Sequence, residues 1–311
     1  MSTAPDRHAA SHAAPEPSAV DLAILRTVAY ASLFEAPVSL PELERTLMDE
    51  PLPSDVLAAR VRGPFLRRWL SVTDGLVHLR GREGWVPLRR ARQRRSRDLI
   101  ERHRRALATL ARLPFVRLVA LSGACARDNA ADDDVDVFLI VRRGRAWAVC
   151  LAQMLLCKLL GVRRTLCVNY VLDEALLALP ERDLFTASEI VGLRPLAGGE
   201  TYRRFVAANA WVAALYPNFL DRYREESWQV REPASPRWLE TLLELGPAPL
   251  LEATSRLLLG ARLRRKARGA AGVELTPHRL KLHTRDHRPR VAAAFDAALR
   301  RLGIASEEAW P

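Results

Sequence analysis

The sequence has few cysteines and almost no lysine. Its four cysteines include no C-x-x-C pair and three lie in apolar runs, which indicates reduced thiols, not disulfides or a zinc site. Only three lysines occur, so arginine supplies nearly all of the formal net charge of +12. Arginine suits phosphate recognition. A coding bias toward arginine and alanine explains most of the overall balance, so each local cluster has to be judged by itself.

Several catalytic and targeting signals are absent as well. No G-x-S-x-G motif supports a serine hydrolase. His278, His283 and His287 form no ligand-spaced helical pair and are expected to be surface groups. Residues 1–18 lack the apolar core of a signal peptide and are expected to form a disordered tail.

The longest apolar run, residues 146–162, contains Gln153 and Lys158 and lies at the lower limit for a membrane span. It indicates a buried helix instead. We therefore expect a cytoplasmic protein with no membrane partner.

Residues 19–95 are expected to form a winged-helix-like domain. Three helical segments precede two short β-prone runs, and Asp74-Gly75 between these runs is a hairpin signal. Ser39 and Glu42 fit a capping box at the start of the second helical segment. A small α+β packing module is the alternative.

Residues 88–113 indicate one long helix with a very basic first half. Its arginines surround the helix instead of forming one stripe. Beside a winged-helix-like domain, this helix predicts nucleic-acid binding through residues 88–105. A solvated linker helix explains the pattern equally well, and the lack of interleaved aromatic residues argues against single-strand binding.

The remaining chain indicates an α/β (α+β) fold. Residues 96–230 include the connecting basic helix and three apolar strands, at 115–123, 135–141 and 166–172, with the buried helix before the third. This order predicts a mixed sheet with flanking helices. Residues 231–311 have helical periodicity and are expected to form a C-terminal helical region.

The densest acid cluster of this basic chain directly precedes the second strand. Residues two apart in a strand share a face, so Asp134 and Asp136 should project together, with Val135 on the other face. Two close carboxylates on a rigid strand make a good divalent-cation site, and their repulsion favours a bound cation. A solvated acidic turn is the alternative. An EF-hand loop is excluded because Val137 occupies the position of its glycine.

Small residues end the preceding strand, at Ser122, Gly123 and Ala124. They allow backbone N–H groups to come close to a ligand, and a turn entering a helix would direct these donors at a phosphate. The sequence therefore predicts phosphate-binding amides on one side and metal-binding carboxylates on the other.

The stretch SGACARDNAADDDVDVFLIV resembles the signature of the nucleotidyltransferase superfamily, which has the DNA polymerase β-like fold. That signature is a strand, Gly-Ser, a loop, and Asp-x-Asp in a second strand, and Arg127 falls at an arginine of the form GSxARG…SDIDLFIV. The wider chain is similar to uncharacterised bacterial and archaeal nucleotidyltransferase-domain proteins with a winged-helix-like front end.

The resemblance implies a nucleotidyltransferase-type mixed sheet and a specific reaction. Asp134 and Asp136 would bind Mg²⁺ or Mn²⁺, and a nucleoside monophosphate would pass from a nucleoside triphosphate to an acceptor hydroxyl. The phosphates would contact four nucleotide-binding residues, namely Ser122, Gly123, Ala124 and Arg127.

Two positions depart from the family pattern. Ala124 replaces the usual serine, and Asn169 stands where the family places a third catalytic carboxylate. Asp173 and Glu174 could substitute only if their strand turned back. A catalytically diverged regulator that binds nucleotide or nucleic acid is therefore the alternative to an enzyme. A small-molecule modifier would share the same site and differ only in its acceptor.

Overall fold

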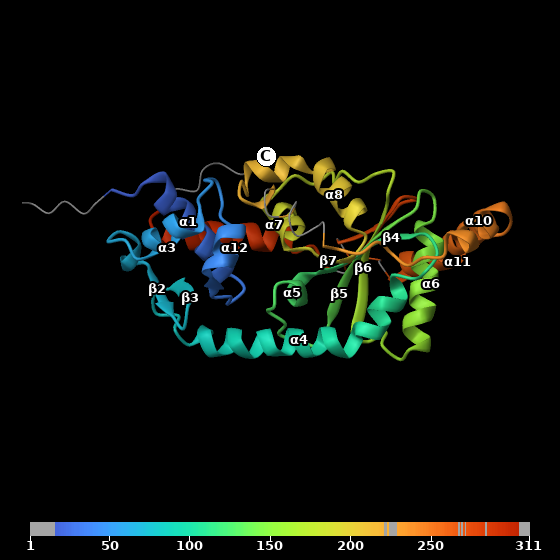
Figure 1. Ribbon diagram of the computed structural model, residues 1–311, viewed down its shortest axis with the longest axis horizontal. Coiled ribbons are helices and arrows are strands. Elements are labelled where there is room, and N and C mark those ends of the chain that lie inside the picture. The colour runs from blue at the N-terminus through green and yellow to red at the C-terminus, as the bar shows by residue number, and fades with distance from the viewer. Residues whose placement is uncertain are drawn as a thin grey trace, which may run out of the picture.

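The computed structural model describes residues 16–220, 223, 229–266, 268, 270, 272–283 and 285–304. The tail expected at residues 1–18 lies outside this part of the chain except for its last three residues. Eleven α-helices and two sheets in the described residues form a mixed α/β fold, which confirms the expected class at this level. The N-terminal elements lie at one end of the molecule and the larger sheet lies toward the other (Figure 1).

The N-terminal unit contains the three helices and the hairpin that the sequence predicts. Its elements are α1 (Ala19–Ser32), β1 (Val38–Ser39), α2 (Leu40–Arg45), α3 (Ser54–Val61), the 3-10 helix η1 (Leu66–Arg68), β2 (Leu70–Thr73) and β3 (Leu76–Leu79). Positive φ angles of 51° at Asp74 and 75° at Gly75 make the tight turn between β2 and β3. The predicted capping box is present, since Ser39 Oγ accepts from the Glu42 N–H and the Glu42 carboxylate accepts from the Ser39 N–H.

The central sheet has the strand order β7-β4-β5-β6-β9-β8. The elements of its first part are α4 (Trp85–Leu110), β4 (Val116–Ser122), α5 (Gly123–Ala126), β5 (Val135–Val141), α6 (Ala146–Leu159), β6 (Leu166–Asp173), α7 (Leu184–Gly192), β7 (Arg194–Ala197), α8 (Gly199–Ala208) and the 3-10 helix η2 (Ala210–Ala214). β5 and β6 are parallel, and β4 is antiparallel to both β5 and β7. The three predicted strands are thus confirmed as β4, β5 and β6.

Both faces of the sheet are buried, as the continuous apolar run of β5 requires. Phe138 and Ile140 belong to the core shared with α7, α8 and α12. Val137 and Leu139 belong to the opposite core, shared with α4, α6 and α11. This alternation fixes Asp136 on the same face as Phe138, at the edge of the first core.

The expectation that residues 231–311 form a helical region is correct only in part. Helices α10 (Arg237–Leu245), α11 (Ala248–Lys266) and α12 (Arg288–Arg301) are present. Between them, however, β8 (Val273–Leu275) and β9 (Arg279–Leu282) extend the central sheet, with β9 antiparallel to β6. These strands have three and four residues, too few for a periodic apolar signal.

Two further expectations about helices need correction. The expected domain boundary at residue 95 falls inside the continuous helix α4. The helix predicted at 146–162 ends at Leu159 and is buried along one face, which includes Gln153 and Cys157, whereas Leu155 and Leu159 are exposed. In the described part of the chain, no helix has the length and apolar character needed to cross a membrane.

Candidate functional site

The residues of the predicted signature meet where β4 ends and β5 begins. Ser122 and Asp136 are directly opposite each other in the antiparallel pair. Gly123 follows with φ of +64°, and a Cβ atom built on it would lie 2.6 Å from Oδ2 of Asp136. Only glycine therefore fits at this position without displacing the carboxylate.

Asn169 lies beside Asp136, where the sequence places the third site residue. β6 pairs Val168 with Val137 and Tyr170 with Phe138, so Asn169 is an extra residue between two paired positions. Its Nδ2 atom donates a short hydrogen bond to Oδ1 of Asp136. The position of this residue is as expected, and its side chain is a neutral amide.

Asp173 and Glu174, at the C-terminal end of β6, do not replace a missing carboxylate. Asp173 is fully buried at the other end of β6, where it accepts hydrogen bonds from the Gly144 and Ala175 N–H groups and contacts His278. Glu174 follows it and contacts Arg204. Asp173 therefore holds the turns at the far end of the sheet together.

The carboxylate of Asp136 lies in a strongly unfavourable place for a negative charge. Burial, together with the charges of Asp134, Glu189 and Asp132, raises the pKa of Asp136 to about 7, although the hydrogen bond from Asn169 acts in the opposite direction. Asp134 is exposed, and desolvation together with its acidic neighbours also raises its pKa.

Within the described part of the chain, neither member of this acid pair has a cationic partner. No Lys, Arg or His side chain forms an ion pair with Asp134 or Asp136 in the described residues. A bound cation would relieve the repulsion between them.

The burial of Asp136 predicts a specific dependence of stability on pH. The pKa of Asp136 rises from 3.8 to about 7 on folding. The carboxyl group therefore does not destabilise the fold below pH about 4, and its destabilisation is complete above pH about 7. Without metal, the free energy of unfolding should therefore fall as the pH rises through this window, by up to about 4 kcal/mol. Denaturant titrations at pH 4.5 and 7.5 should show that Asp136→Asn removes most of this fall. An equal fall in the variant would contradict the burial of this charge.

The donor set at this site consists of a few oxygen ligands and does not form a closed metal site. Within the described ranges, no group of three or more His, Cys, Asp or Glu side chains is arranged to hold a metal. Asp134 and Asp136 offer carboxylate oxygens, and Asn169 could add its amide oxygen if the amide turned over. Mg²⁺ accepts such oxygen ligands, usually retains several waters, and is commonly bound by one or two carboxylates together with substrate phosphates.

A cavity of about 540 Å³ opens beside the acid pair, within the usual range for small-molecule sites. Five of the predicted site residues line it, namely Ser122, Gly123, Ala124, Arg127 and Asp136. Asn169 lines a second cavity of about 230 Å³, and Asp134 lines neither. The Asp136–Asn169 contact therefore stands between two cavities.

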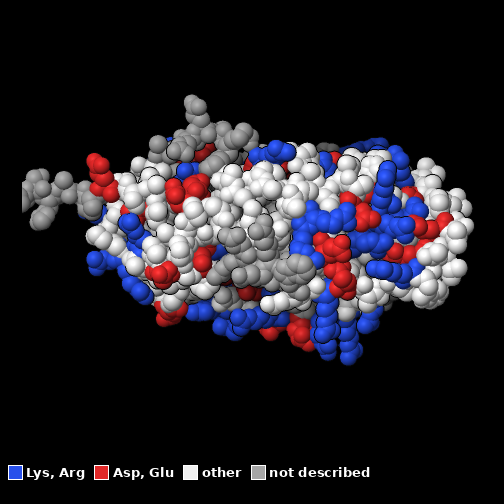
Figure 2. All heavy atoms as spheres, turned by 45° about the horizontal axis from the view of Figure 1, so that its top comes forward, with Lys and Arg blue, Asp and Glu red and all other residues white. Residues whose placement is uncertain are grey.

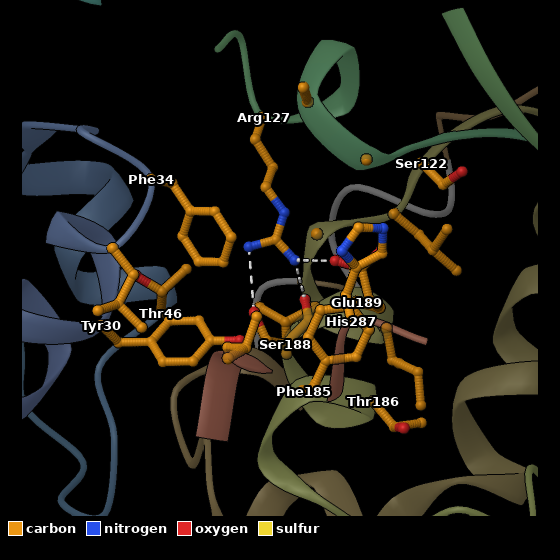
Figure 3. A pocket seen from close by; sticks show the side chains of 18 of the residues that line it. Tyr30, Phe34, Thr46, Ser122, Arg127, Phe185, Thr186, Ser188, Glu189 and His287 are labelled. Atoms are coloured by element: carbon orange, nitrogen blue, oxygen red, sulfur yellow. Dashed lines mark hydrogen bonds and ion pairs between the residues drawn. The ribbon is translucent and has the colours of Figure 1, made fainter. Parts of the chain in front are cut away.

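Arg127 points into the larger cavity but is already engaged there (Figure 3). Its guanidinium donates to the hydroxyl and the carbonyl of Ser188 at 3.1 and 2.6 Å, and to Glu189 at 3.0 Å. An incoming phosphate would have to compete with the Glu189 carboxylate for this guanidinium. The predicted nucleotide contact of Arg127 thus requires a rearrangement of the Arg127–Glu189 ion pair.

Sequence reasoning missed three walls of this cavity. Tyr30 and Phe34 come from the N-terminal unit, and Phe185 comes from α7 (Figure 3). The third wall comes from residues 281–294 and includes His283 and His287, which were expected to be surface groups. No local signal could have found these residues, because three distant segments of the chain form the cavity together.

Helix α4 holds the acidic loop in place. Arg89 is 2% exposed and donates to the carbonyls of Arg127 and Asp128. Arg95 binds the carbonyl of Asp132 and the carboxylate of Asp133, each at 2.9 Å. Part of the basic helix therefore positions the loop between β4 and β5. A second set of arginines stays exposed, at Arg94, Arg97, Arg102 and Arg105.

Comparison with known proteins identifies no relative, since no family model, no curated protein and no solved structure matches the chain.

Proposed function

We propose that the protein is a Mg²⁺-dependent nucleotidyltransferase that transfers a nucleoside monophosphate from a nucleoside triphosphate to an acceptor hydroxyl. One observation carries the proposal: Gly123, Asp136 and Asn169 come together at the edge of the large cavity. A glycine with a left-handed backbone, lying against a half-buried carboxylate that pairs with no cation among the described residues, suits a site for phosphate and metal. The resemblance of the signature to the nucleotidyltransferase superfamily supports the same chemistry.

Each part of the site has a separate task in this proposal. Asp134 and Asp136 would hold Mg²⁺, which neutralises charge on the phosphates when bound. The N–H groups of Gly123 and Ala124 lie at the first turn of α5 and would donate to phosphate oxygens. The apolar and aromatic walls of the cavity, Phe34 among them, would enclose the nucleoside.

Isothermal titration with ATP, GTP, CTP and UTP, each with Mg²⁺, tests this proposal. At least one nucleotide should bind the wild-type protein, and the binding should require the metal. Asp136→Ala should remove it while the far-ultraviolet circular dichroism stays unchanged. Absence of binding by all four nucleotides in a folded sample would contradict the proposal.

A second candidate is a catalytically diverged protein that binds nucleic acid. Two observations favour it: Asn169 gives the site an amide in place of a carboxylate, and Arg94, Arg97, Arg102 and Arg105 of α4 are exposed to solvent. The element order α1, β1, α2, α3, β2, β3 also fits a winged-helix-like unit. Salt-sensitive DNA or RNA binding that survives Asp136→Ala would favour this candidate over the enzyme.

A further inference from the structure

Helix α10 is amphipathic in the reverse of the usual sense. Its acids face the protein: Glu240 is 4% exposed and pairs with Arg117, and Glu244 pairs with Arg142. Three of its apolar side chains face outward, whereas Leu243 packs against the core of the sheet. Exposed fractions reach 66% at Trp238, 58% at Leu242 and 82% at Leu245.

Helix α11 adds leucines to the same end of the molecule. Its inner face buries Ala248, Ser255 and Leu259, and it packs against α6. Four leucines elsewhere on the helix are exposed, Leu250 at 67%, Leu251 at 46%, and Leu257 and Leu258 at 70% each. The two helices lie at the end of the molecule opposite the N-terminal unit (Figure 1). Figure 2 shows mostly uncharged surface at that extremity, beside a cluster of mixed charges.

We propose that this apolar face binds the same face of a second copy of the chain, so that the protein is a homodimer joined through its α10–α11 hairpins. The face consists of Trp238, Leu242, Leu245, Leu250, Leu251, Leu257 and Leu258. The inference does not depend on the nucleotide chemistry, because α10 and α11 contribute no residue to the large cavity.

The spacing of these residues fits a helical partner. Trp238, Leu242 and Leu245 follow one another at steps of four and three, the spacing of the seam between packed helices. Leu250 and Leu257, like Leu251 and Leu258, are seven residues apart. Two such hairpins facing each other would make a four-helix arrangement in which each apolar row is covered.

The exposed area matches what a stable dimer needs. A tryptophan contributes about 150–250 Å² when fully buried, and a leucine roughly 100 Å² if its burial is worth about 2.5 kcal/mol. Scaled by their exposed fractions, the seven side chains offer on the order of 500 Å² of apolar surface per copy. A standard interface buries about 800 Å² per partner, somewhat more than half of it apolar.

The charges also favour a second copy. The acids Glu240, Glu244 and Glu252 all bind groups of this chain, which leaves Arg237 and Arg256 as the charged groups on the exposed side between residues 237 and 258. Depletion of charge at the centre is typical of protein interfaces. In an antiparallel pair, the basic ends around Arg264 and Arg265 would lie far apart, so they would not repel.

Sedimentation equilibrium of the full chain tests the inference. The wild-type protein should have twice the mass of one chain at micromolar concentration. The double variant Leu242→Glu with Leu258→Glu should have the mass of one chain and keep its circular dichroism spectrum. Val56→Glu is the matched control, because Val56 is a 40% exposed apolar residue on α3 in the N-terminal unit, and it should remain a dimer.

Three results would overturn the proposal. One is a monomeric wild-type protein at 100 µM or more; another is a double variant that stays dimeric. The third is a monomeric wild-type protein that co-sediments with anionic lipid vesicles, which would assign the apolar face to a membrane surface.

Discussion

Replacing Gly123 with alanine is expected to weaken binding of a Mg²⁺–nucleotide strongly while the protein remains folded. The new Cβ would lie 2.6 Å from Oδ2 of Asp136, and residues other than glycine rarely adopt a backbone φ of +64°. The backbone strain costs about 1–2 kcal/mol. Displacement of the Asp136 carboxylate would then separate the metal ligand from the phosphate donors, so affinity should fall at least about tenfold, which is about 1.4 kcal/mol.

Gly161→Ala is the matched control for this substitution. Gly161 has φ of +71°, and nothing lies within 4 Å of the position of its Cβ, so it carries the same backbone strain without a carboxylate contact. Both variants should lose similar stability in thermal denaturation, but only Gly123→Ala should lose nucleotide affinity in calorimetry. Equal affinities in the two variants would contradict the role given to the Gly123–Asp136 contact.

Replacing Glu240 with glutamine is expected to cause the largest loss of stability. This carboxylate is 4% exposed and accepts hydrogen bonds from Arg117, from the Ser235 hydroxyl and from the Phe115 N–H. Removal of one partner from a buried ion pair leaves the other charge unpaired and costs about 3–5 kcal/mol. Urea denaturation should show a loss of this size in Glu240→Gln.

The same group predicts a loss of stability in acid. Burial opposes the charge of Glu240, but hydrogen bonds from Arg117, Ser235 and the Phe115 N–H outweigh it and hold the pKa at about 2. Because this pKa is lower than the unfolded value of 4.5, the ionised carboxylate stabilises the folded protein above pH 4.5. This stabilisation is lost as the pH falls from 4.5 toward 2. In Glu240→Gln, the free energy of unfolding should not show this decrease between pH 4.5 and 2.

Glu244→Gln serves as the control for both measurements. Glu244 also pairs with arginine, but its side chain is 26% exposed, so its removal should cost less than about 1 kcal/mol. If the two variants lost the same stability, the buried network around Glu240 would not be the main attachment of α10 to the sheet.

The features that the sequence predicted correctly are local in the chain. The run from Val137 to Val141 is apolar throughout, and Asp134 and Asp136 lie two residues apart just before it, so the strand and the face of Asp136 follow from periodicity alone. The Asp74-Gly75 turn and the Ser39–Glu42 capping box likewise need only a few neighbouring residues. In each case, the residues that determine the structure lie within one short segment of the chain.

The features that the sequence could not predict depend on distant segments. Periodicity alone does not place Asn169 beside Asp136; the family resemblance indicates that position, and the contact forms because β6 carries one extra residue between two paired positions. The leucines of α10 predict a helix but not which side faces the protein. That choice follows from Arg117 and Arg142, which are more than ninety residues earlier in the chain and attract the acids inward.

The acid cluster of this arginine-rich chain has two parts with different surroundings. Asp133 is paired with Arg95 of α4, and the neighbouring carbonyl groups are also bound by that helix. Asp134 and Asp136 have no such partner in the described residues, although arginines are abundant nearby. The arginines that hold the loop leave the pair open on the side where a metal and a triphosphate are proposed to bind.

A crystal structure with Mn²⁺ and a non-hydrolysable nucleoside triphosphate analogue tests the central claim most directly. Anomalous scattering should place Mn²⁺ in contact with Asp134 and Asp136, and phosphate oxygens should lie within hydrogen-bonding distance of the Gly123 and Ala124 N–H groups. Nucleotide bound elsewhere, or Mn²⁺ bound without contact to Asp136, would contradict the account.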